Sequence, residues 1–326
     1  MDKEAGITSF QLISRLRRAL GVRRAGHCGT LDPFATGALP AAFGRYTTAL
    51  HFMEGYDKVY AFTARLGAAT DTYDHEGKIM MSIPEQSLAD LYASGELHRR
   101  VQTLTPRFSG VQIQTPPMYS AIKVDGKPLY QYARSGQEIE RKSREIRIAI
   151  QSLTLKAEEG RVLLEGVLQV SKGSYIRSWV HVFGEALGTY AHCIQLRRLR
   201  CGPFSADQGI RSGDLLSLYD ELGKDPGLVF DALVKENKIL PLEAAWPEIP
   251  TVDTTEKEAL DIICGRRILW DSGWEERLKP ATDSERAGRV FLRFNGKALA
   301  MAFLTEEEGA RTLKTERVWM QRDDLF

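Results

Sequence analysis

Three segments of β-type sequence most constrain the fold of this chain. Residues 144–156 and 161–170 flank the short turn Glu158-Glu159-Gly160, and residues 58–66 alternate between apolar and polar side chains. Such alternation is typical of strands that bury one face, and two strands joined by a short turn pair antiparallel. We therefore expect an α/β (α+β) protein around a mixed, largely antiparallel sheet.

Helical periodicity appears before, between and after these segments. Thr8 and Ser9 can cap a helix that presents Phe10, Ile13, Leu16 and Leu20 on one face and ends at Gly21. A second buried helix face is predicted from Ile176 to Leu187, ended by Gly188. Further helices are expected over 84–97, 212–222 and 228–236.

Three prolines near residue 240 indicate a domain boundary. Pro241, Pro247 and Pro250 bracket a segment without periodicity, so we expect one domain over 1–240 and another over 250–326. In the second, Thr255 and Glu258 form a capping-box pattern, and Asn295-Gly296 is a hairpin signal between alternating strands. The tail is thus predicted to be a small, mostly β module.

Composition excludes several classes of protein. Hydrophobic residues make up 43% of the chain and charged residues 27%, the balance of a folded protein rather than a disordered or fibrous one. No apolar run is long enough to span a membrane, and no signal-peptide pattern opens the chain, so we expect a cytoplasmic protein. The four cysteines form no CxxC pair, which favours reduced, mostly buried thiols over disulfides or structural zinc.

The formal net charge is only +1, but the basic residues are clustered, within 15–24, 141–147 and 197–200. Such clusters can form a local phosphate-binding face. Solvated charged faces of helices and strands are the alternative.

The segment GHCGTLDPFATG, residues 26–37, belongs to a long stretch without periodicity, and such stretches in compact chains are often functional. Asp32 precedes Pro33, which favours an extended backbone, and the nearby glycines allow close approach of a partner. This arrangement suits an accessible carboxylate. From these residues alone, an Asp-Pro turn that bonds its own backbone remains an alternative.

The same segment, extended to GHCGTLDPFATGALP, resembles the catalytic loop of the TruB family of tRNA pseudouridine synthases. Four more blocks resemble that family in its order: DKVYAFTARLGAATDTYDHEG, QTPPMYSAIKVDGKPLYQYARSG, SKGSYIRSWV and LGTYAHCIQLRRLRCGPF. Together they extend over residues 2–204. Position and pattern also make the tail similar to the PUA-like module of bacterial members, and this likeness is weaker.

The resemblance implies isomerisation of uridine 55 in the T-loop of tRNA to pseudouridine. The C1′–N1 glycosidic bond must break, the uracil must turn, and C5 must bond to C1′. By match, Asp32 is the carboxylate that attacks C1′, or that supports elimination and stabilises positive charge there. Uracil can leave as a stabilised anion, so neither a metal nor an organic cofactor is expected.

Other site residues also follow from the match. Tyr60 would stack on the target base and could take part in removing the C5 proton, and Arg177 would pair with the catalytic carboxylate. Tyr175 and Leu196 would line the uracil pocket, and His27 would insert where flipped bases leave the stack. Without the resemblance, a structural role would be the simpler reading of Tyr60, Tyr175, Leu196 and His27.

Several basic residues are candidates for phosphate contacts, and some could instead form structural ion pairs. They are Lys3, Arg15, Arg18, Arg23, Arg24, Arg141, Arg197 and Arg198. The expected partner is tRNA, bound by a monomer that needs no protein partner and no membrane. Alternatives are a non-catalytic protein that binds or folds tRNA, and a synthase for another RNA, as in the related dyskerin-type enzymes.

The chain departs from the family pattern at two positions near the loop. Glu4 stands where a proline is usual, and Thr48 stands where a lysine is common. The second departure suggests that one basic RNA contact is missing.

Overall fold

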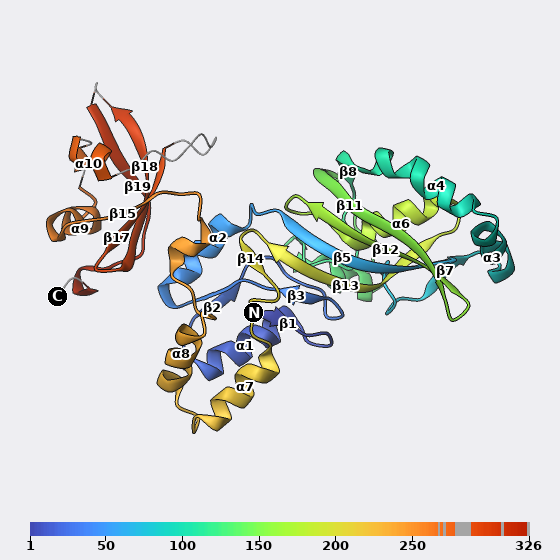
Figure 1. Ribbon diagram of the computed structural model, residues 1–326, viewed down its shortest axis with the longest axis horizontal. Helices are drawn as coiled ribbons and strands as arrows, with labels where there is room; N and C mark the ends of the chain where they lie inside the picture. Colours follow the sequence, from blue (N-terminus) through green and yellow to red (C-terminus); the bar gives the residue numbers. More distant parts are fainter. Residues whose placement is uncertain (267, 270–271, 278–287, 308–309, 325–326) are drawn as a thin grey trace.

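The computed structural model describes the chain except residues 267, 270–271, 278–287, 308–309 and 325–326. Its largest element is an eight-stranded sheet (Figure 1), in which only β13 and β3 pair in parallel, so the predicted mixed, largely antiparallel sheet is confirmed. The strand order is β1 (Asp2–Lys3), β3 (Thr36–Ala38), β13 (Ala191–Cys201), β5 (Lys58–Leu66), β12 (Arg161–Val170), β11 (Arg144–Glu158) and β8 (Gly110–Gln114), and β14 (Phe204–Ser205) pairs with β13.

The predicted hairpin joins β11 and β12. Their ladder runs from the pair Ile148 and Val170 to the pair Glu158 and Arg161. The turn between them places Glu159 at φ 49° and Gly160 at φ 73°. Two positive φ angles in a two-residue loop match the right-handed twist of the strands.

Helix α1 (Ser9–Ala19) begins where the sequence predicts, with a capping box between Thr8 and Gln11. The predicted apolar face is wrong at Phe10, which is 73% exposed, whereas Leu12 is fully buried. Leu12 packs into the main core under the sheet, while Ile13 packs against α7 (Ser212–Glu221) and α8 (Pro226–Lys235), so the helix has two buried sides.

The prediction of one helix over 84–97 is wrong. Two helices stand there, α3 (Glu85–Ala93) and α4 (Glu96–Leu104), separated at Gly95. Gly95 has φ 72°, a left-handed conformation that ends one helix and lets the next begin at an angle. By contrast, α6 (Ile176–Leu187) is confirmed; it packs on β13 and ends at Gly188, also left-handed.

Short elements complete the N-terminal part. The strands are β2 (Ala25–His27), β4 (Ala41–Phe43), β6 (Ala68–Thr70), β7 (Ile79–Ser82), β9 (Lys123–Val124) and β10 (Lys127–Pro128). The helices are α2 (Leu50–Met53) and α5 (Leu129–Arg134), with 3₁₀ turns at Gly44–Ala49, Thr105–Phe108, Leu242–Ala245 and, at the C-terminus, Arg322–Asp324. No helix in the described ranges is long and apolar enough to cross a membrane.

A second sheet forms the C-terminal part, apart from the first in Figure 1. Its strand order is β15 (Thr251–Asp253), β17 (Arg289–Phe294), β18 (Lys297–Glu307), β19 (Ala310–Val318) and β16 (Ile268–Leu269), with helices α9 (Glu256–Ile263) and α10 (Ser272–Arg277). The capping box at Thr255 and the Asn295-Gly296 hairpin are both present. The expected β-rich, PUA-like module is confirmed.

An aromatic cluster connects this module to the N-terminal part. Trp319 is 3% exposed and stacks on Phe291, with ring centroids 5.6 Å apart. Its indole Nε1 donates a hydrogen bond to Thr48 Oγ1 at 3.2 Å. Arg45 forms an ion pair with Asp324 beside it. Thr48 therefore contacts the C-terminal module.

Candidate active site

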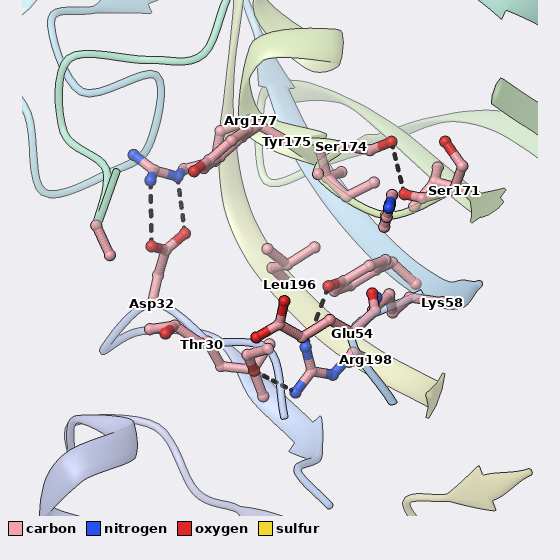
Figure 2. Close-up of a pocket in the computed structure, with 18 of the residues that line it drawn as sticks. Thr30, Asp32, Glu54, Lys58, Ser171, Ser174, Tyr175, Arg177, Leu196 and Arg198 are labelled. Carbon is pink, nitrogen blue, oxygen red and sulfur yellow. Dashed lines mark hydrogen bonds and ion pairs between the residues drawn. The ribbon is translucent and has the colours of Figure 1, made fainter. Parts of the chain in front are cut away.

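A cleft of about 940 Å³ opens between the 26–37 loop, the sheet and the start of α6 (Figure 2). Seven of the residues predicted for the site line it, namely His27, Asp32, Tyr60, Tyr175, Arg177, Leu196 and Arg198. The other predicted phosphate contacts do not: Lys3, Arg15, Arg18, Arg23, Arg24, Arg141 and Arg197. The loop, two strands and a helix N-terminus thus converge on one cavity.

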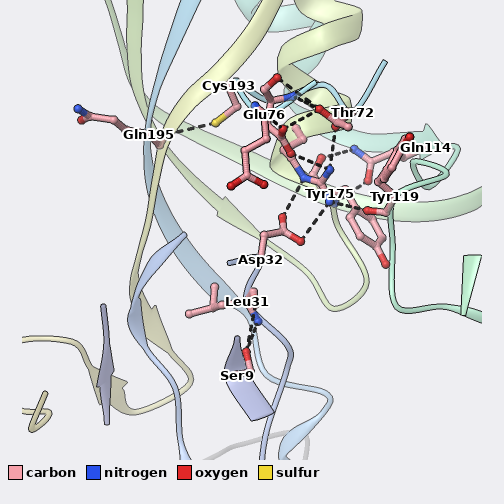
Figure 3. Close-up of polar contacts among 12 residues, drawn as sticks. Ser9, Leu31, Asp32, Thr72, Glu76, Gln114, Tyr119, Tyr175, Cys193 and Gln195 are labelled. Atoms are coloured by element: carbon pink, nitrogen blue, oxygen red, sulfur yellow. Dashed lines mark hydrogen bonds and ion pairs between the residues drawn. The ribbon is translucent and has the colours of Figure 1, made fainter. Parts of the chain in front are cut away.

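The backbone before Asp32 is held by Ser9 at the start of α1. The amide of Leu31 donates to Ser9 Oγ at 3.0 Å, and this hydroxyl donates to the Leu31 carbonyl at 3.1 Å (Figure 3). Both groups are buried, so the loop is fixed one residue before the carboxylate.

The backbone after Asp32 is held by Lys3. Its Nζ donates to the carbonyls of Pro33 at 3.0 Å and Ala35 at 2.7 Å. Lys3 is fully buried, and burial lowers its pKa to about 8. A buried ammonium that already donates to carbonyls does not reach a phosphate, so the structure contradicts the predicted phosphate contact of Lys3 and gives this side chain a role in holding the loop.

Glu4, next in the chain, bonds to the start of α7. Its carboxylate accepts from Ser212 Oγ at 2.8 Å and from the Gly213 amide at 2.9 Å. Glu4 therefore connects β1 to a helix N-terminus, where a negative charge is favourable.

Arg177 pairs with Asp32 through two nitrogen atoms (Figure 2). Its Nε lies 2.8 Å from Oδ2, and its Nη2 donates to Oδ1 at 3.1 Å. The guanidinium is 3% exposed, whereas the Asp32 side chain is 31% exposed and faces the cleft. A two-point contact of this kind fixes the direction of the carboxylate.

Sequence reasoning missed a second carboxylate on the same arginine. Asp74 Oδ2 accepts from Arg177 Nη1 at 3.1 Å, and Asp74 Oδ1 accepts from Thr72 Oγ1 at 2.6 Å. The backbone carbonyls of Thr72 and Tyr119 accept the remaining hydrogen bonds, each at 2.8 Å. The acid-rich turn TDTYDHEG was the available signal, but nothing in it points to Arg177.

Burial raises the pKa of the Asp32 carboxyl. The Arg177 guanidinium opposes this rise, and the Asp74 carboxylate adds to it. Asp32 is thus partly withdrawn from water and paired with a cation. A carboxylate in this state is more nucleophilic than a fully hydrated one and remains oriented toward the cavity.

Tyr60 on β5 and Leu196 on β13 form one apolar wall of the cleft. They are 8% and 6% exposed. In the β13–β5 ladder Tyr60 is the partner of Arg198, which the sequence placed among the phosphate contacts. Arg198 is instead 1% exposed and donates to the Tyr60 hydroxyl at 3.4 Å, which contradicts that prediction.

His27 and Tyr175 both line the cleft, but different contacts hold them there. His27 is half-buried on β2, and its Nδ1 has no hydrogen-bond partner among the described residues. Burial, with the charge of Arg198, lowers the pKa of His27, so the imidazole is neutral at pH 7. The Tyr175 backbone is held by two hydrogen bonds with Gln114, at 2.7 and 3.0 Å.

Two further predicted phosphate contacts, Arg197 and Arg141, make intramolecular contacts. Arg197 donates to both carboxylate oxygens of Asp2 at 3.0 Å, and its side chain is 39% exposed. Arg141 donates to the Pro116 carbonyl at 3.1 Å and lies 3.7 Å from Glu138. RNA contacts by these two residues stay predictions.

The free thiols are mostly buried, as expected. Cys28, Cys193 and Cys201 are buried and Cys264 is exposed. Within the described ranges, no group of three or more His, Cys, Asp or Glu side chains is arranged to hold a metal ion.

Comparison with known proteins first defines the class. Residues 17–176, which carry the Asp32 loop, β5 and the Asp74 turn, match the model of the TruB family pseudouridylate synthase, N-terminal domain. The fold is similar to that of a solved Cbf5-Nop10-Gar1 complex, with a TM-score of 0.63 and 24% identity over 99% of this chain and 85% of that one. A pseudouridine synthase fold therefore surrounds the cleft.

Similarity to curated relatives then identifies the family of this chain. The tRNA pseudouridine synthase B of Geobacter sulfurreducens is 40% identical over 74% of each chain. That of Rhodospirillum rubrum is 36% identical over 94% of this chain and 92% of its own, and that of Chlamydia trachomatis serovar L2 is 46% identical over 66% of this chain and 84% of its own. The chain belongs to the TruB family of pseudouridine synthases.

Proposed function

We propose that this chain converts uridine 55 in the T-loop of tRNA to pseudouridine, with Asp32 as nucleophile. The Asp32–Arg177 ion pair at the wall of the cleft is the observation that carries the proposal. The names of the relatives, tRNA pseudouridine synthase B, support the substrate.

In this mechanism the Asp32 carboxylate attacks C1′ of the flipped nucleotide. The C1′–N1 bond breaks and its electron pair leaves with the uracil anion, so no acid is needed at that step. The uracil then turns between Tyr60 and Leu196, and C5 attacks C1′ while the bond from Asp32 breaks. Loss of the C5 proton and gain of a proton at N1 complete the isomerisation.

The remaining residues would bind the RNA. We propose that His27, a neutral half-buried imidazole, stacks where the target base leaves the loop, and that the Tyr175 ring contacts the flipped nucleotide. Residues 1–240 would form the catalytic domain and residues 250–326 an accessory RNA-binding domain of a monomer.

Tritium release tests the proposal. Purified protein is incubated with unmodified tRNA labelled with tritium at uridine C5, and the wild type is compared with Asp32→Asn. A tRNA with cytidine instead of uridine at position 55 serves as the matched control substrate. We expect release by the wild type only, and only from the tRNA that carries uridine 55.

Other outcomes would each select an alternative. Release from the cytidine-55 tRNA would mean that another uridine is the target. Binding of tRNA without release would favour a non-catalytic RNA-binding protein. Equal release by Asp32→Asn would remove Asp32 from the mechanism.

A further inference from the structure

Arg198 is a buried cation in the lining of the cleft (Figure 2). It lies on β13 and is the largest of the fully buried side chains. Its Nε donates to the Ala38 carbonyl at 2.6 Å and its Nη2 to the Gly29 carbonyl at 2.9 Å. These two carbonyls stand before and after Asp32 in the chain, so the guanidinium is held in one position by the catalytic loop.

The third group that Arg198 contacts is the phenol of Tyr60. Nη1 donates to the hydroxyl oxygen at 3.4 Å, and Cζ lies 6.0 Å from the ring centroid. In the part of the chain that the structure describes, no carboxylate lies within ion-pair distance of Arg198. The cation thus has neutral acceptors only, and the Tyr60 oxygen is the acceptor that can become an anion.

The surroundings keep the pKa of the Tyr60 phenol above its ordinary value, and Arg198 limits this rise. Burial raises the pKa of the Tyr60 phenol, and the charge of Arg198 and its hydrogen bond oppose the rise. A fixed, poorly hydrated cation stabilises a neighbouring negative charge more than it would in water. Arg177 cannot do this, because it is already paired with two carboxylates.

We propose that Arg198 is a positioning residue that orients the Tyr60 oxygen and compensates negative charge on it while this oxygen takes the proton from C5 of the turned uracil. The inference rests on the proposed function. After C5 has bonded to C1′, the C5–H bond breaks and its electron pair forms the C5–C6 double bond. The electron pair of the C6–N1 double bond takes a proton from solvent at N1.

The proton from C5 goes to the Tyr60 phenolate, which earlier released its own proton to solvent. The protons and electrons of this step therefore balance without any other reactant. Loss of the Arg198 charge should slow this step, whereas loss of its hydrogen bonds to the Ala38 and Gly29 carbonyls acts on the catalytic loop and so on earlier steps. The C5 isotope effect distinguishes the two.

Single-turnover experiments with tRNA carrying hydrogen or deuterium at C5 test the inference. For Arg198→Met, which keeps a long side chain without charge, we expect turnover at pH 7 to fall by at least about tenfold, the equivalent of one pKa unit. The C5 isotope effect should rise, and the rate should recover toward high pH. Arg200→Met, which removes an exposed arginine from the same strand, is the matched control and should leave the isotope effect unchanged.

Arg198→Lys keeps the charge and separates charge from loop positioning. Its turnover can fall, but its isotope effect should stay near that of the wild type. An unchanged isotope effect and pH profile in Arg198→Met, or a raised isotope effect in Arg198→Lys, would overturn the inference. Absence of any turnover by the wild type would instead refute the proposed function.

Discussion

The Nε and Nη2 atoms of Arg177 lie 2.8 and 3.1 Å from the two carboxylate oxygens of Asp32. One guanidinium thereby sets both the direction and the hydration of the proposed nucleophile. The same arginine contacts Asp74 from its other side, so its own position is fixed by a buried acid. This three-residue arrangement gives predictions for rate and for pH dependence.

Arg177→Lys should reduce turnover while leaving tRNA binding largely intact. A lysine retains the charge but cannot reach both oxygens of Asp32 and Asp74 together. We expect kcat to fall by about 10²-fold, the order seen when one preorganised electrostatic contact is removed. Single-turnover rates and filter binding measure the two effects. A variant with unchanged kcat would show that the two-point contact does not matter.

The pH dependence of turnover should report the raised pKa of Asp32. The ionised carboxylate is the reactive form, so activity should be lost as pH falls through a pKa above the ordinary aspartate value. Asp74→Asn removes a negative charge that raises this pKa, and its acid limb should therefore move to lower pH. Asp71→Asn, in the same turn, is the control. A shift to higher pH in Asp74→Asn would contradict this assignment.

The sequence predicted elements best where the information is local. The capping box at Thr255 and the Asn295-Gly296 hairpin depend on neighbouring residues, and both are found. Gly95 shows the limit of this reasoning: periodicity continued through it, but its left-handed backbone divides the helix. The Asp32–Arg177 pair was expected only because several blocks together resembled one family.

Burial of charged residues was not predictable in the same way. Lys3 and Arg198 look like surface cations in the sequence, and only the tertiary fold surrounds them with carbonyls. Alternation along β13 did contain a signal, since Leu196 and Arg198 share one side of the strand and Arg197 lies on the other. Asp74 could not be placed, because its partner is more than 100 residues away in the chain.

Lys3→Met should destabilise the protein and lower activity together. The change leaves the buried Ala35 carbonyl without the Lys3 ammonium, whereas the Pro33 carbonyl keeps its hydrogen bond from the Gly6 amide. We expect a loss of about 2 kcal/mol in the free energy of unfolding, the cost of an unsatisfied buried polar group. Lys238→Met, which removes a single surface hydrogen bond, should cost about 0.5 kcal/mol or less. Urea denaturation measures both, and equal losses would refute the role of Lys3 in the loop.

The contact between the two sheets depends on Trp319. Trp319→Ala would empty a buried aromatic site and should lower the free energy of unfolding by about 3–5 kcal/mol. Trp319→Phe keeps a ring against Phe291 and loses only the hydrogen bond to Thr48, so about 1 kcal/mol is expected. The buried cluster around Trp319 also contains Cys28, which lies four residues before Asp32. Trp319→Ala should therefore slow turnover as well. Normal turnover in a measurably destabilised Trp319→Ala would show that the catalytic loop keeps its conformation without this contact.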